Sequence, residues 1–204
     1  MGDSVPHTPC QRGNAPLESR FPSGKLSGDF NIMKALIVID YQNDFVNGAL
    51  GFAGAELLEP IILEKISECR NNGGQVIFTL DTHGEDYLST AEGRKLPVKH
   101  CVDGTVGHAL YGKIAECVTP SDIVIKKPSF GSLELAEILK RGNYDEVELC
   151  GLVTDICVVS NAVIAKAALP ESRIVVDGKA CASFDSEKHK AALEVMKSVQ
   201  VDVV

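Results

Sequence analysis

Several features are missing from this sequence, and each absence argues against a class of protein. No apolar run approaches the ~20 residues that a transmembrane helix needs, so a membrane protein is not expected. The seven cysteines are scattered and include no CxxC pair. This argues against a disulfide framework and a thiolate zinc site, and it predicts a reducing, cytoplasmic location. The formal net charge is -8 and there is no lysine or arginine stripe, so neither nucleic acid nor an anionic membrane is an expected partner.

The length and composition suit one globular domain, because 204 residues of which 45% are hydrophobic can bury a sizeable core. Residues 1–32 differ from the rest, being rich in glycine, proline and serine with little apolar periodicity. They also lack the apolar core of a signal peptide. We therefore predict a disordered extension or an added leader over 1–32, followed by one folded domain over 33–204.

Strand and helix patterns alternate along this domain. Apolar runs predict strands over 34–40, 75–80, 122–125, 146–150 and 173–177, with a sixth over 200–204. Helical periodicity predicts helices over 57–70, 109–117, 133–140, 157–167 and 187–198. Such alternation is typical of an α/β fold in three layers, with a mostly parallel sheet of about six strands and helices on both faces.

Polar and reactive residues follow the ends of the predicted strands. They are Asp40, Asp81, Lys126 with Lys127, Cys157 and Asp177. In open parallel sheets, ligands bind outside the carboxyl ends of the strands, so we expect these side chains to gather at one edge of the sheet.

Cys157 is a candidate nucleophile, because the first turn of a helix favours thiolate over thiol. A buried structural thiol is the competing interpretation. Asp40 is a candidate base for the Cys157 proton, or else caps a turn. Lys127 is a candidate for the cation between them, with a surface lysine as the alternative and Lys126 as a competing choice. The N–H groups of Val153 and Cys157 are candidates for an oxyanion hole.

A long irregular segment, 82–107, carries a possible set of metal ligands. Asp81 and His83 are two residues apart at the exit of a strand, and Glu92 and His100 lie within the same segment. Nitrogen and oxygen ligands of this kind suit a divalent transition metal. Histidines in exposed loops are also common without any ligand, so the pattern leaves both interpretations open.

The motifs together resemble a known family, the isochorismatase-like cysteine hydrolases. The resemblance runs in order through ALIVIDYQNDF (35–45), DTH (81–83), LPVKHC with GT and G (96–107), KPSF (127–130), GLVTDICV (151–158) and DGKACAS (177–183). It therefore covers essentially all of 33–204. Within this family, the resemblance is greatest to the nicotinamidases and pyrazinamidases.

The resemblance implies a Rossmann-like sheet and a catalytic triad of Asp40, Lys127 and Cys157. It also implies a non-proline cis peptide bond before the nucleophile, between Leu152 and Val153. It further implies a homo-oligomer.

Within the family, nicotinamidases carry a metal site, and its counterparts here are Asp81, His83 and His100, with Glu92 as a fourth ligand. Zinc is the first expectation, with manganese or iron as alternatives.

The substrate-binding residues that the resemblance implies are Phe45, Leu96 and Leu152. Nicotinamidases usually place an aromatic residue, often tryptophan, shortly before the second metal histidine, but this sequence contains no tryptophan and has Leu96-Pro97-Val98 there. Phe45 matches the other ring-packing position.

The function that the resemblance implies is a cysteine-dependent amidohydrolase. It would convert nicotinamide or pyrazinamide to the carboxylic acid and ammonia through a thioester. The alternative enzyme acts on another small amide, a ureido acid or a vinyl ether. An alternative of another class is a family member that only binds a small molecule or a partner protein.

Overall fold

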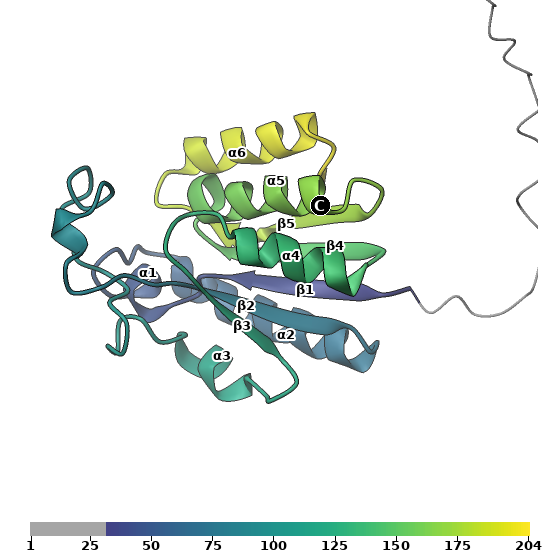
Figure 1. Cartoon of the computed structure of the whole chain (residues 1–204), viewed down its shortest axis with the longest axis horizontal. Coiled ribbons are helices and arrows are strands. Elements are labelled where there is room, and N and C mark those ends of the chain that lie inside the picture. The colour runs from purple at the N-terminus through teal and green to yellow at the C-terminus, as the bar shows by residue number, and fades with distance from the viewer. Residues whose placement is uncertain (1–31) are drawn as a thin grey trace, which may run out of the picture. The chain divides into compact units, whose positions relative to one another are not determined.

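The computed structural model describes residues 32–204, so the extension predicted over 1–32 lies outside the described residues except for Ile32. Six parallel strands form one sheet in the order β3-β2-β1-β4-β5-β6 (Figure 1). Their bounds are β1 Lys34–Ile39, β2 Gln75–Asp81, β3 Ile123–Lys127, β4 Glu146–Leu152, β5 Arg173–Ala182 and β6 Asp202–Val203. The predicted α/β class and the predicted parallel sheet are confirmed.

Helices cover both faces of this sheet (Figure 1). On one face lie α2 (Glu59–Asn71) and α3 (Gly112–Cys117), and on the other lie α4 (Leu133–Gly142), α5 (Val159–Ala168) and α6 (Ser186–Ser198). A short helix, α1 (Asn43–Val46), and two 3-10 turns, Ala55–Leu58 and Tyr87–Ser89, lie in the loops. Within residues 32–204, no helix is both long enough and apolar enough to cross a bilayer.

The central strand β1 is buried on both faces, as its unbroken apolar sequence predicts. Residues 35–39 are all buried, and β1 pairs with β2 on one side and β4 on the other. The covering helices begin at local signals. Ser132 accepts a hydrogen bond from the Leu135 N–H and caps α4, while Asp185 accepts from the N–H groups of Glu187 and Lys188 and caps α6. These caps fix where each crossover begins.

Several predicted element bounds differ from the structure by a few residues, and two of these differences lie next to the strand ends that carry the polar residues. β5 continues to Ala182, five residues past the predicted end, because it pairs with β4 again after a register shift. The helix predicted over 157–167 is divided into a π-helical turn, Thr154–Val158, and α5. The N–H groups of Ile156 and Val158 both bond to the Val153 carbonyl, which widens the turn. Cys157 therefore lies in this π turn and not at the start of an α-helix.

The backbone between β4 and the π turn has an unusual conformation. The Leu152–Val153 peptide bond is cis, as the family resemblance implies. Gly151, one residue earlier, has a φ of 114°, and a Cβ at this position would lie 2.1 Å from the carbonyl oxygen of Ile39. Only glycine combines this dihedral angle with so close an approach of two strands.

We expect Gly151→Ala to lower the free energy of unfolding by more than the ~1–3 kcal/mol that a disallowed φ alone costs, because the clash with β1 adds to it. Gly73→Ala is the matched control, since Gly73 also has a positive φ, 71°, but has no atom within 4 Å of the added Cβ. Urea unfolding of both variants measures the difference. Equal losses of stability would show that the close approach to Ile39 has no energetic consequence.

Candidate active site

The carboxyl ends of four neighbouring strands bring the predicted polar residues together. Asp40 follows β1, Asp81 ends β2, Lys127 ends β3 and Cys157 follows β4. Asp177 does not join this group, because its carboxylate pairs with Lys65 of α2 at 2.6 Å. Asp177 was predicted at the end of a strand, but β5 continues to Ala182 and Asp177 lies inside it. The prediction of a shared edge therefore holds for the ends of β1 to β4 and is wrong for Asp177.

Lys127 lies at the centre of the group and is fully buried. Its Nζ lies 2.6 Å from Asp40 Oδ2, 3.5 Å from Cys157 Sγ and 3.4 Å from Asp81 Oδ1. It also donates to the Ser129 carbonyl at 3.0 Å. Lys126 points the other way, and its exposed Nζ pairs with Asp103 at 2.6 Å. The structure thus separates the two neighbouring lysines, and only Lys127 faces the acid and the thiol.

Burial controls the protonation of this group. It raises the pKa of the Cys157 thiol well above its ordinary value, and the charge of Asp40 raises it further. Burial also raises the pKa of Asp40, although Lys127 lowers it in part. For Lys127, burial alone would lower the pKa, but the charges of Asp40, Cys157 and Asp81 raise it. Burial thus favours the thiol form of Cys157, which is opposite to the effect expected from the first turn of a helix.

Asp40 is held by a second contact. The Thr79 hydroxyl donates to its Oδ1 at 2.7 Å, which leaves Oδ2 for Lys127. Asp40 also has a φ of 44°, a left-handed conformation that aspartate tolerates better than most residues. The carboxylate is therefore oriented from both of its oxygens.

Val153 and Cys157 stand at the turn where an oxyanion hole was predicted. Within residues 32–204, the backbone hydrogen bonds of turns and loops include none donated by the Val153 N–H. Both residues line the same pocket. A backbone N–H in the pocket that contains the cysteine sulfur is the type of donor that stabilises a developing oxyanion.

Asp81, His83 and His100 form a compact cluster of possible metal ligands. One ligand atom from each residue lies within 4.8 Å of the others, and all three residues are buried. Oδ2 of Asp81 lies 2.9 Å from Nε2 of His83 and 3.4 Å from Nε2 of His100. His100 uses its Nδ1 to donate to the Val98 carbonyl at 2.8 Å, so Nε2 is the nitrogen that faces the cluster.

Glu92 faces this cluster from the edge. Its Oε1 lies 3.8 Å from His83 Nε2 and 3.9 Å from His100 Nε2. Two imidazoles and one or two carboxylates suit a divalent transition metal. The hydrogen bond from His100 Nδ1 to the Val98 carbonyl fixes the orientation of the ring, as is usual for histidines that bind metals. The cluster is therefore a candidate divalent metal site.

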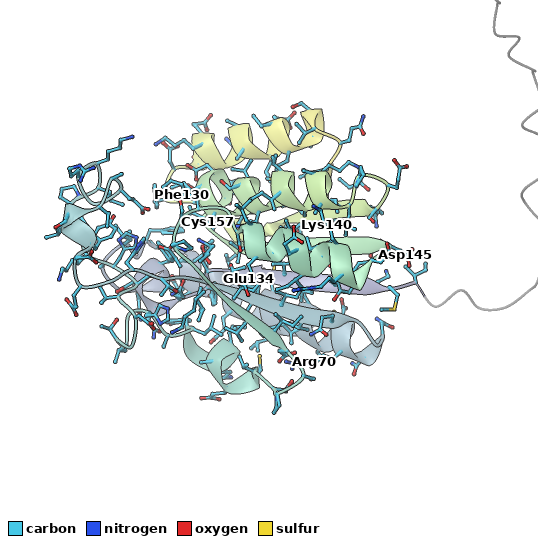
Figure 2. The ribbon with its side chains drawn as sticks, in the orientation of Figure 1. Arg70, Phe130, Glu134, Lys140, Asp145 and Cys157 are labelled. Atoms are coloured by element: carbon cyan, nitrogen blue, oxygen red, sulfur yellow. The ribbon has the colours of Figure 1, made fainter. Side chains whose placement is uncertain are left out.

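A pocket with an empty volume of about 450 Å³ joins the two groups. Its lining residues are Phe45, Leu50, Asp81, Glu92, Leu96, His100, Phe130, Val153, Ile156, Cys157 and Phe184. Polar atoms thus lie beside apolar and aromatic walls, as in most small-molecule sites. Figure 2 shows Phe130 and Cys157 at the same end of the sheet, opposite the end that carries Asp145.

The predicted substrate-binding residues divide into two groups. Phe45 and Leu96 line the pocket, but Leu152 is fully buried in the core and does not. Phe130 and Phe184 are pocket residues that sequence reasoning did not single out. Each follows the carboxyl end of a strand, β3 or β5, which is the signal that located the polar residues. These phenylalanines supply aromatic wall in a pocket that has no tryptophan.

The π turn is anchored from behind by α6. Thr154, its first residue, is fully buried, and its Oγ1 forms a hydrogen bond with Nδ1 of His189 at 2.8 Å. His189 lies on α6, which packs against the turn. This side-chain contact ties the segment between Val153 and Cys157 to the last helix.

The family model for the isochorismatase domain matches residues 34–204. The chain belongs to the isochorismatase family. This confirms the family that the sequence motifs indicate, and the match covers the whole predicted domain except its first residue.

Three relatives illustrate the similarity. A nicotinamidase/pyrazinamidase of Mycobacterium tuberculosis is 29% identical over 188 residues, which cover 84% of this chain and 98% of that protein. The crystal structure of a Bacillus subtilis nicotinamidase/pyrazinamidase is 34% identical, with a TM-score of 0.77, and covers 85% of this chain and 100% of its own. The pyrazinamidase of Pyrococcus horikoshii in complex with zinc is 28% identical, with a TM-score of 0.74 and corresponding coverages of 84% and 98%.

We expect His189→Leu to destabilise the domain, because it leaves the buried Thr154 hydroxyl without a partner. Such a loss costs ~1–3 kcal/mol, and each kcal/mol lowers the Tm of a domain of this size by roughly 2–4 °C. His189→Asn is the control, because the side-chain amide offers a polar atom close to the position of Nδ1. Differential scanning calorimetry compares the two variants. An equal Tm for His189→Leu and His189→Asn would contradict the anchoring role of this hydrogen bond.

Proposed function

We propose that this chain is an amidohydrolase of the nicotinamidase type, which converts nicotinamide or pyrazinamide to the carboxylic acid and ammonia. The observation that carries the proposal is the buried Lys127 ammonium, which contacts both Asp40 and Cys157 at one end of a pocket. The names of the relatives support the same reaction, since those of Bacillus subtilis and Mycobacterium tuberculosis are called nicotinamidase/pyrazinamidase.

The first step is attack by the cysteine on the carboxamide. Asp40 takes the proton of Cys157, and the charge of Lys127 stabilises the thiolate that forms. Sγ then bonds to the carbonyl carbon, and the N–H groups of Val153 and Cys157 stabilise the oxyanion. Burial raises the pKa of Cys157 and so favours the thiol, which is why a base is needed to form the attacking thiolate.

The second step releases ammonia and then the acid. Asp40 returns its proton to the leaving nitrogen, the C–N bond breaks, and a thioester remains on Cys157. Asp40 next takes a proton from water, whose oxygen attacks the thioester carbon. The C–S bond breaks, the acid leaves, and the sulfur regains a proton. The balance is one amide and one water consumed, with one carboxylic acid and one ammonia formed.

We propose that Asp81, His83 and His100 hold a divalent metal ion, with Glu92 as the fourth protein ligand. Zinc is the first choice, because the Pyrococcus horikoshii relative was crystallised in complex with zinc, and manganese or iron are alternatives. When bound, the ion supplies a Lewis acid that anchors a ring nitrogen of the substrate. Phe45, with the other apolar wall residues, would bind the ring faces.

The side chains that line the pocket favour an uncharged aromatic amide over a ureido acid. They include Asp81 and Glu92 but no lysine or arginine. A buried substrate carboxylate would therefore have only the proposed metal ion as a cationic partner, and the ion would then not be free for a ring nitrogen. A cytoplasmic location and a homo-oligomer remain predictions from the sequence and the family resemblance.

Cys157→Ala should abolish ammonia release from nicotinamide and pyrazinamide, because no other group supplies the attacking sulfur. Cys69→Ala is the matched control, since Cys69 lies on α2, outside the pocket. A coupled ammonia assay, with circular dichroism to verify folding, measures the effect. Turnover retained by folded Cys157→Ala would refute the cysteine mechanism, and no turnover by the wild-type enzyme would refute these substrates.

His83→Ala and His100→Ala should each lose bound metal, because either change removes one of the two imidazole ligands. Mass spectrometric metal analysis of the purified proteins measures metal per chain without reference to activity. His189→Asn controls for the loss of a histidine elsewhere and should keep the wild-type content. A wild-type protein that is free of metal after purification and after incubation with zinc would contradict the proposed site.

A further inference from the structure

A second cavity adjoins the pocket on its outer side. Its lining residues are Ala91, Glu92, Lys95, Leu96, Ser129, Phe130 and Ile156, and its empty volume is about 750 Å³. Four of these residues, Glu92, Leu96, Phe130 and Ile156, also line the inner pocket that contains Cys157. The two cavities are therefore neighbours that share one wall. We call the second cavity the outer groove.

Three of the four shared residues, Leu96, Phe130 and Ile156, are apolar. Leu96 and Phe130 are 38% and 42% exposed, although both are large hydrophobic side chains. Apolar surface of this kind, continuous with a substrate pocket, gains free energy when a ligand covers it. The lining residues come from the 82–107 segment, from the loop after β3 and, in the case of Ile156, from the π turn. The groove therefore opens between loops rather than within the core.

The charges around the groove limit what can occupy it. Glu92 faces both cavities, and its carboxylate disfavours an anionic group there. Lys95, which lies in the same turn as Glu92, is exposed and disfavours a cation. An uncharged, apolar group is the occupant that the walls favour.

We propose that the outer groove is a substrate subsite that takes an uncharged apolar substituent on the ring of the amide. This inference rests on the proposed amidohydrolase function and extends its substrate class from nicotinamide to ring-alkylated pyridine carboxamides. The reaction at the carboxamide is unchanged, because the substituent takes no part in bond making or breaking.

The test compares kcat/KM for nicotinamide with kcat/KM for its 4-, 5- and 6-propyl derivatives. We expect at least one propyl isomer to be hydrolysed with a kcat/KM within about tenfold of nicotinamide. Ala91→Trp, which fills the groove, should lower the ratio of propyl derivative to nicotinamide by about 10–200-fold, the range that a filled or missing apolar contact produces. Ala115→Trp, on the exposed surface of α3, should leave that ratio unchanged.

Hydrolysis of nicotinamide but of no propyl isomer would overturn the proposal, and so would equal losses for both substrates in Ala91→Trp. Ala91→Leu is the smaller replacement if the tryptophan variant does not fold. Calorimetry of ligand binding to Cys157→Ala tests the groove without requiring catalysis. It therefore separates this inference from the proposed amidohydrolase activity. We expect a propyl carboxamide to bind Cys157→Ala, and to bind at least tenfold more weakly when Ala91→Trp is added. This result would support the groove even if the wild-type enzyme did not hydrolyse nicotinamide.

Discussion

The candidate site depends on one buried cation. Lys127 is an ammonium with no exposed surface, and such a charge stays protonated in a protein interior only where acids surround it. Asp40 and Asp81 provide those acids from the ends of two other strands. The same ammonium contacts the sulfur of Cys157. The ammonium of Lys127, at the end of β3, therefore links groups from the ends of β1 and β2 to the π turn that carries Cys157.

Asp81 couples the two halves of the site. Its Oδ1 faces Lys127, while its Oδ2 faces both imidazoles. Burial alone would raise the pKa of Asp81, but hydrogen bonds from His100 and His83 and the charge of Lys127 lower it below its ordinary value. Two carboxylates against one ammonium leave excess negative charge in a buried place. A divalent cation beside Oδ2 would offset this charge, which is a physical reason for a metal cluster and an acid–lysine–cysteine group to share one aspartate.

The sequence predicted those site residues whose positions follow directly from the parallel sheet. Strand ends alone located Asp40, Asp81 and Cys157 at one edge, because parallel strands bring their carboxyl ends together. Sequence pattern did not separate Lys126 from Lys127, since both follow the same apolar run and only the paired sheet shows which one points inward. It also missed the π turn and the raised pKa of Cys157, which depend on packing around the turn. Phe130 and Phe184 escaped notice because aromatic residues in loops have no periodicity, and Leu152 was assigned to the pocket although β4 directs it into the core.

The nucleophile turn takes its support from distant parts of the chain. Gly151 lets β4 approach β1, and Thr154 is held by His189 near the end of the sequence. Phe184, just before α6, forms part of the pocket wall. The helix that anchors the turn is thus preceded by a residue that lines the pocket. A displacement of α6 would move both the wall and the N–H groups beside Cys157, so the fit of a ligand and the geometry of attack are set by the same packing contact.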